Sequence, residues 1–168
     1  MTPIVSIIMG STSDLPVMEK AAKFLDDMDV PFEMNALSAH RTPAEVESFA
    51  RNAKARGIRV IIAGAGMAAA LPGIIAASTT VPVIGVPIKG MLDGLDAMLS
   101  IIQMPPGIPV ATVGVNGAQN AAILAVEMLA LADEALAKRL EQYKDSLKEK
   151  IVKANAELAT VCYKNKTN

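Results

Sequence analysis

Several residue types that carry common chemistries are rare in this sequence. Among its 168 residues there are one cysteine, Cys162, and one histidine, His40, with no tryptophan and two tyrosines. A single cysteine excludes an intrachain disulfide and a cysteine metal cluster, and it is typical of a reducing compartment. The N-terminus enters an apolar strand pattern without a basic leader, so we expect a cytoplasmic protein. A net charge of -1 predicts neither a nucleic-acid nor a membrane partner.

Charged residues are scarce through the middle of the chain. Between positions 60 and 132 the only ones are Lys89, Asp93, Asp96 and Glu127. Glycines and prolines interrupt this span at the short intervals of alternating strands and helices, which argues against membrane spans. A monomer of this size has too much surface to bury the whole span, so we expect a homo-oligomer.

Short apolar runs alternate with helix-like stretches, as in a parallel α/β sheet. The runs predict strands at about 4–9, 31–37, 59–63, 81–87 and 108–113. Helices are predicted at about 15–28, 43–56 and 118–131, with two more after the third and fourth strands, the latter ending at Ile102. At this length we expect a single domain, 1–168, with a core at about 4–132 and a helical extension at about 133–163.

The extension is predicted to be one long amphipathic helix. Apolar side chains recur along it at three- and four-residue steps, at Ala135, Leu136, Leu140, Tyr143, Leu147, Ile151 and Leu158. Such a stripe needs a surface to pack against. Its own domain and a neighbouring subunit are both open as that surface.

Small polar residues follow the first predicted strand. Residues 10–14 read Gly-Ser-Thr-Ser-Asp and lead into a helix. Backbone N–H groups and hydroxyls at a helix start suit a phosphate or carboxylate. Simple capping of the helix by Ser13 or Asp14 explains the same residues equally well.

The second strand ends in residues 38–43, Ser-Ala-His-Arg-Thr-Pro. Thr42 is predicted to cap the following helix, with Glu45 as its capping-box partner. His40 carries the one side chain of the sequence that ordinarily exchanges protons near neutral pH. Ligands of open parallel sheets bind outside the carboxyl ends of the strands, so His40 and Arg41 are candidate site residues.

The third strand leads into residues 64–73, a stretch of minimal side chains that begins Gly-Ala-Gly. Ala69 takes the third position of a dinucleotide fingerprint, but no acidic residue follows at the distance expected for a ribose partner, so a nicotinamide cofactor is not predicted. The small residues indicate either a wall that a flat ligand approaches closely or tight backbone packing.

In this order and spacing the three strand-end motifs closely resemble the PurE family. Residues 81–87, 103–105 and 120–122 resemble it too, and the match covers about residues 4–132. The resemblance implies a three-layer α/β/α sandwich of the flavodoxin-like type with a five-stranded parallel sheet, and an octamer of identical subunits. It implies 5-(carboxyamino)imidazole ribonucleotide mutase activity in de novo purine synthesis. The electron-rich aminoimidazole requires no metal or organic cofactor.

The resemblance also implies roles for individual residues. His40 matches the general acid/base, while Ser11, Asp14 and Arg41 match groups that bind the phosphate or ribose of the substrate. The other substrate-binding residues that we predict are Ser13, Ser38, Ala39, Gly64, Ala65, Gly66, Ala69 and Leu71. Loss of CO2 from the exocyclic nitrogen and its recapture by ring carbon C4 would then use His40 for both proton transfers.

The sequence departs from the commoner family pattern at Ala70, where many members carry a second histidine. This departure bears on the choice between the mutase and the first of two alternatives that stay open. One is direct carboxylation of aminoimidazole ribonucleotide by CO2, within the same family. The other is a non-catalytic flavin- or nucleotide-binding module, which the turn at residues 10–14 supports and the absence of aromatic residues from the strand-end loops opposes.

Overall fold

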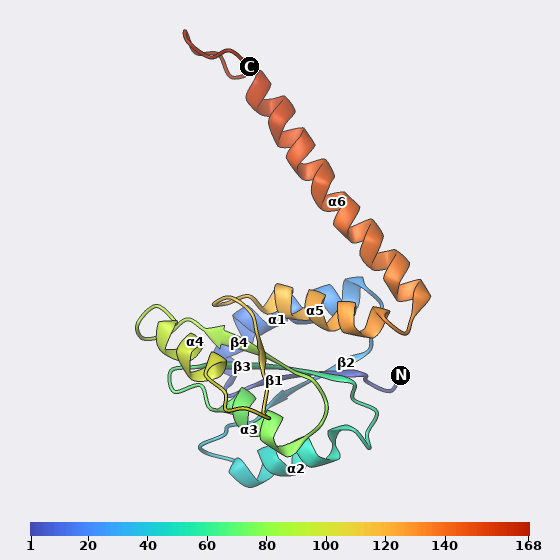
Figure 1. Ribbon diagram of the computed structural model, residues 1–168, viewed down its shortest axis with the longest axis vertical. Coiled ribbons are helices and arrows are strands. Elements are labelled where there is room, and N and C mark those ends of the chain that lie inside the picture. Colours follow the sequence, from blue (N-terminus) through green and yellow to red (C-terminus); the bar gives the residue numbers. More distant parts are fainter.

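The computed structural model describes all 168 residues and contains one parallel sheet, with the strands in the order β2-β1-β3-β4-β5 (Figure 1). The strands are β1 (Val5–Met9), β2 (Phe32–Ala36), β3 (Val60–Gly66), β4 (Val83–Ile88) and β5 (Ala111–Thr112). Every residue of β1 and β4 is buried, as expected for continuous apolar strands that are covered on both faces. The edge strand β2 is only partly buried: Met34 and Ala36 are exposed, whereas the polar Glu33 and Asn35 are half-buried.

Helices cover both faces of this sheet and complete three layers (Figure 1). They are a short 3-10 helix, η1 (Thr12–Asp14), and then α1 (Leu15–Asp27), α2 (Pro43–Ala53), α3 (Leu71–Ser78), α4 (Leu95–Ile102), α5 (Ala118–Ala130) and α6 (Glu134–Ala159). Helices α1 and α5 and the start of α6 enclose one apolar cluster with the sheet, whereas α2, α3 and α4 enclose the other. The predicted sandwich and its five-stranded sheet are confirmed.

Within the core, three predicted boundaries differ from the structure by about three residues. The third strand continues to Gly66, because the Gly-Ala-Gly segment pairs with β4 as far as Ile88. The second helix ends at Ala53 rather than near residue 56. The fifth strand contains two residues instead of six; Pro109 lacks the N–H that a longer ladder needs, and residues 105–107 form a turn before it.

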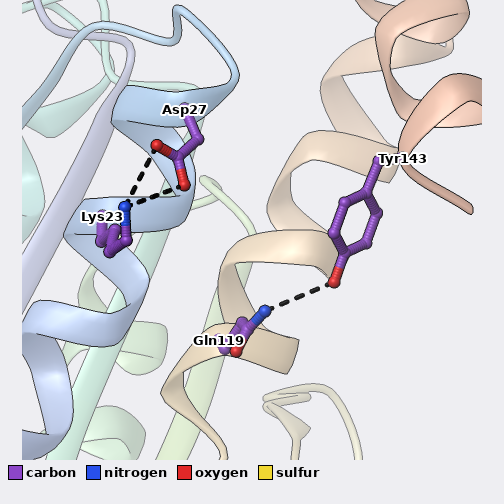
Figure 2. A network of polar contacts seen from close by, with 4 residues as sticks. All are labelled: Lys23, Asp27, Gln119 and Tyr143. Atoms are coloured by element: carbon purple, nitrogen blue, oxygen red, sulfur yellow. Dashed lines mark hydrogen bonds and ion pairs between the residues drawn. The ribbon is translucent and has the colours of Figure 1, made fainter. Parts of the chain in front are cut away.

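Helix α6 is attached to the domain only along its first turns. Leu136 and Leu140 are buried, and the Tyr143 ring packs edge-on against Phe24 of α1 at 4.9 Å between centroids. The Tyr143 hydroxyl accepts a hydrogen bond from Gln119 of α5 at 3.3 Å (Figure 2). Beyond this point the helix projects from the sandwich (Figure 1), and Ile151 is 66% exposed. The proximal half of the predicted stripe therefore packs on its own domain, and the distal half has no neighbour within the chain.

No helix in the structure combines the length and the apolar character needed to cross a membrane.

Candidate active site

The carboxyl ends of the three strands β2, β1 and β3 lie next to one another. Met9, the last residue of β1, is in register with Ala36 at the end of β2 and with Gly64 of β3. The Leu37 N–H donates to the Met9 carbonyl at 2.9 Å and extends this pairing past the end of β2. The segments that follow these strands therefore adjoin at one edge of the sheet, as the sequence predicted.

The turn after β1 is organised by Ser11. Its Oγ accepts a hydrogen bond from the Ser13 N–H at 3.3 Å, and its carbonyl accepts one from the Asp14 N–H at 3.1 Å. Asp14 stands at the N-cap position of α1, as predicted, but its side chain makes no capping hydrogen bond. The side-chain cap is instead made by Ser11, at the start of the 3-10 turn η1 that precedes α1.

Asp14 is partly buried, and this alters its acidity. Desolvation raises the pKa of the Asp14 carboxyl above its ordinary value, while the backbone at Ser11 opposes the shift with a smaller effect. A ligand hydroxyl that donates to this carboxylate would favour its ionised form.

The loop after β2 is held by a reciprocal contact between Ser38 and Thr42. Thr42 Oγ1 accepts from the Ser38 N–H at 2.9 Å and donates to the Ser38 carbonyl at 3.1 Å. The predicted capping box with Glu45 is therefore absent: Thr42 occupies the N-cap position, but its hydroxyl is used inside the loop.

Arg41 joins this loop to the turn after β1. Its Nε donates to Ser38 Oγ at 3.3 Å, and its Nη2 donates to the Gly10 carbonyl at 3.0 Å. The guanidinium remains exposed and keeps further N–H donors. The Arg41 guanidinium is thus held between Ser38 and the turn at Ser11. Its remaining N–H groups form a planar fork of donors, which suits a phosphate.

His40 is exposed, and its imidazole has no hydrogen-bond partner in the chain. Its backbone is nevertheless anchored, since the preceding Ala39 is 9% exposed and belongs to an apolar cluster beneath α2. The backbone therefore fixes the point of attachment of the ring beside Arg41, and both ring nitrogens are available.

The third side of the site consists of the end of β3 and the loop up to α3. Here Ala65, Ala69 and Leu71 are 6%, 4% and 2% exposed, and their side chains lie in the apolar core. Leu71 therefore has only backbone to offer a ligand. Met67 and Ala69 have positive φ angles of 57° and 36°, which L-residues adopt at a cost of about 1–2 kcal/mol each.

Gly64 supports the packing interpretation of the small residues. A Cβ at this position would lie 2.5 Å from the sulfur of the buried Met18. We call the end of β3 and the loop up to α3 the wall of the site. Gly64 is required by the packing of the core on one side of this wall, and residues 66–70 form the side that faces the site.

The groove that is best defined in the chain does not coincide with these residues. A groove of about 730 Å3 runs along α2 and is lined by Leu37, Ala44, Glu45, Ser48, Phe49, Asn52, Ala55 and Arg56. None of the predicted site residues lines it. In a single chain the predicted site is an open edge rather than a closed pocket.

Two residues that the sequence did not identify as candidates lie at the same edge. Lys89 follows β4 directly, and its N–H donates to Oδ1 of Asn116, which follows β5, at 2.9 Å. A signal for Lys89 was present, since no other lysine or arginine occurs between Arg59 and Lys138.

Comparison with known proteins agrees with this architecture. The family described as AIR carboxylase matches residues 4–150. An N5-carboxyaminoimidazole ribonucleotide mutase from Pyrococcus abyssi is 59% identical over 147 residues, which are 87% of this chain and 84% of that protein. A phosphoribosylaminoimidazole carboxylase from Schizosaccharomyces pombe is 52% identical over 98% of this chain, but the chain spans only 30% of that longer protein.

The solved structure of Treponema denticola PurE superimposes with a TM-score of 0.84 and 31% identity, over 93% of this chain and 98% of that one. The chain therefore belongs to the AIR carboxylase (PurE) family.

Proposed function

We propose that this protein is an N5-carboxyaminoimidazole ribonucleotide mutase of purine biosynthesis in which His40 is the general acid/base. The observation that carries the assignment is the identity of 59% to a mutase over most of both chains, together with a free histidine beside the anchored Arg41. The reaction moves a carboxylate from the exocyclic nitrogen of the aminoimidazole to ring carbon C4.

The polar loops bind the phosphate and ribose of the substrate. Arg41 supplies charged donors for the phosphate, and the Ser11 turn adds hydroxyl and backbone donors at the start of α1. The Asp14 carboxylate accepts hydrogen bonds from ribose hydroxyls. Ser13, Ser38 and Ala39 line the same pocket, and the backbone of Gly64–Leu71 forms a flat wall for the imidazole ring.

His40 completes a proton cycle by itself. Protonated His40 gives its proton to the exocyclic nitrogen as the N–C bond to the carboxylate breaks, which releases CO2 and leaves the amine. Ring carbon C4 then attacks CO2, and the C4 proton passes to the neutral imidazole. His40 ends in its starting state, and the net change is the transfer of the carboxylate.

CO2 has to stay beside C4 between the two steps, which requires a closed site. The single chain leaves His40 and Arg41 exposed. A second copy of the chain that covers this edge would supply the closure. Homo-oligomerisation is therefore part of the proposed function, and the resemblance to PurE supports an assembly of eight subunits.

Two apolar surfaces of the chain are suited to such contacts. Leu95, Leu99 and Ile102 lie along one side of α4 and are 50%, 44% and 56% exposed. The distal half of α6 exposes Ile151 and Leu158. Full burial of one such side chain contributes about 1.5–3 kcal/mol, so a few of them can hold subunits together.

Light scattering at micromolar concentration tests the assembly. We expect a particle near eight times the chain mass of 17.6 kDa, and a stable monomer would contradict the proposal. Each subunit is a single domain, 1–168, and we place the enzyme in the cytoplasm.

Direct carboxylation is the second candidate, because relatives named phosphoribosylaminoimidazole carboxylase match nearly the whole chain. Assays of both nucleotides with and without bicarbonate separate the two activities. The mutase converts the carboxyamino substrate at a rate that does not depend on bicarbonate. Faster turnover of aminoimidazole ribonucleotide with bicarbonate would overturn the mutase assignment.

A further inference from the structure

Lys89 lies beside the wall of the proposed site. Ile88 at the end of β4 is in register with Gly66 at the end of β3, so Lys89 and Met67 leave the sheet next to each other. A Cβ at Gly90 would lie 3.9 Å from Met67 Cγ, which shows that the two loops touch. Among the loops at the carboxyl ends of the five strands, only those of Arg41 and Lys89 carry a cation.

The backbone of Lys89 is held by its neighbours. Asn116 adopts a positive φ of 57°, accepts the Lys89 N–H on Oδ1 and donates its own N–H to the Pro87 carbonyl at 2.8 Å. Gly94, with φ 88°, closes the loop where a Cβ would lie 2.6 Å from Val115. The loop of residues 89–94 is thus tied to the end of β5 on one side and touches Met67 on the other.

The side chain of Lys89, in contrast, is loosely held. Its Nζ pairs with Asp93 at 2.9 Å, and the two side chains are 58% and 89% exposed. Exposed pairs of this kind contribute about 0–1 kcal/mol, so a ligand anion can replace Asp93 at little cost. The ammonium is therefore available to a ligand at this edge of the sheet.

The two cations are carried by backbone segments on opposite sides of β3. Strands β2 and β4 are three strand spacings apart, which is about 14 Å at 4.8 Å each. Arg41 and Lys89 thus flank the wall formed by β3. The proposed substrate has two anionic groups, a phosphate and a carboxylate, at separate places on the molecule.

We propose that Lys89 binds the migrating carboxylate of the substrate and exchanges it with Asp93. This inference rests on the proposed mutase activity and on Arg41 as the phosphate anchor. The carboxylate moves between adjacent positions of one ring edge, so a flexible ammonium can follow it. When the carboxylate becomes neutral CO2, the ammonium pairs with Asp93 again. The Lys89–Asp93 pair thus prevents the enzyme from binding the carboxylated nucleotide so tightly that release of CO2 becomes difficult.

Lys89→Met tests the assignment, with Lys23→Met as the matched control. Lys23 forms the corresponding exposed i,i+4 pair with Asp27, at 3.3 Å, on α1 (Figure 2). We expect Lys89→Met to raise KM for the carboxyamino substrate about 10- to 100-fold with a much smaller change in kcat, as for loss of a charge-assisted hydrogen bond. Lys23→Met keeps both constants, and Lys89→Arg restores part of the affinity.

Direct binding of two nucleotides identifies the group that Lys89 contacts. Lys89→Met should weaken binding of the carboxylated product, whereas 5-aminoimidazole ribonucleotide, which lacks the carboxylate, should bind as it does to the wild type. Equal weakening of both nucleotides would assign Lys89 to the phosphate and overturn the proposal. An unchanged KM would overturn it as well. The wild-type protein in the same assay reports separately whether the mutase activity exists.

Discussion

The two sides of the site are built by opposite means. The loops after β1 and β2 carry hydroxyls, a carboxylate, a cation and an imidazole, and side-chain hydrogen bonds such as Arg41 to Gly10 hold them. The wall after β3 has almost no polar side chain, and core packing holds it in a backbone conformation that includes two positive φ angles. The loops after β1 and β2 supply the groups that bind the substrate and transfer protons, and the wall after β3 supplies a surface against which the ring can pack.

This difference separates the expected effects of substitution. Residues on the polar side are exposed or partly exposed, so their replacement should change turnover or affinity and leave the fold intact. Residues of the wall are packed against the core, so their replacement should change stability first.

The largest effect is expected from His40→Asn. The ring is exposed and unbonded, so the fold and the nucleotide affinity should persist, while kcat falls about 100- to 10,000-fold as for loss of a general acid/base. Steady-state kinetics, with unfolding in urea as the control, measure both. Near-normal turnover would exclude the single-histidine mechanism.

Arg41→Met should act on affinity instead. Loss of the guanidinium removes charged donors to the phosphate and the tie to Gly10, so KM should rise about 10- to 100-fold. Arg41→Lys keeps the charge without the fork and should recover only part of the affinity. The phosphate assignment fails if Arg41→Met lowers kcat and leaves KM unchanged.

Much of the fold could be predicted from the sequence because its signals are local. Apolar runs punctuated by glycine and proline indicated all five strands, and the strand ends indicated that the segments of Ser11 and Arg41 adjoin, as the hydrogen bond from Arg41 to Gly10 confirms. The capping partners could not be predicted, because the Thr42 hydroxyl can bond either the first N–H groups of the helix or the backbone of the preceding loop. In the structure it bonds the N–H and the carbonyl of Ser38.

Lys89 and the two halves of α6 escaped prediction for a different reason. The contact of Asn116 with Lys89 joins residues that lie 27 positions apart, and no local pattern encodes it. The α6 stripe continues at helical spacing past Tyr143, so sequence periodicity could not show that packing on the domain ends there.

Gly64→Ala tests the wall. The added Cβ would lie 2.5 Å from the Met18 sulfur, and accommodating it in a closed core should cost about 1–3 kcal/mol of unfolding free energy. Gly10→Ala is the matched control, since nothing lies within 4 Å of its added Cβ. Urea unfolding compares the two. Equal stability of both variants would show that Gly64 is not required by packing.

Asp14→Asn should show a smaller effect with a defined pH dependence. Burial raises the folded-state pKa of Asp14 above its ordinary value of 3.8, so the ionised carboxylate reduces stability at neutral pH. Its charge at the start of α1 acts in the opposite direction, but the raised pKa indicates that desolvation prevails.

The Asp14→Asn variant should therefore be at least as stable as the wild type at pH 7, although it binds the substrate less well. Its advantage should shrink as the pH falls through the raised pKa, where the native carboxyl becomes neutral too. Urea unfolding from pH 7.5 to 3.5 measures this. A variant that is less stable at pH 7 would indicate that the charge stabilises the fold.

The smallest effect is expected from Ala70→His, which places a side chain that can carry a proton on the wall after β3. Ala70 is half-buried at the N-cap of α3, so an imidazole there can reach the edge of the sheet. If His40 completes the proton cycle alone, a second histidine has no step to accelerate, and kcat should change by less than about tenfold, below the usual effect of a general acid/base. The double variant with His40→Asn is the sharper measurement. Restored turnover in that variant would show that a histidine on the wall can transfer the protons. The wall would then lack a catalytic role because of the residues that it carries in this sequence, and not because of its backbone or its packing.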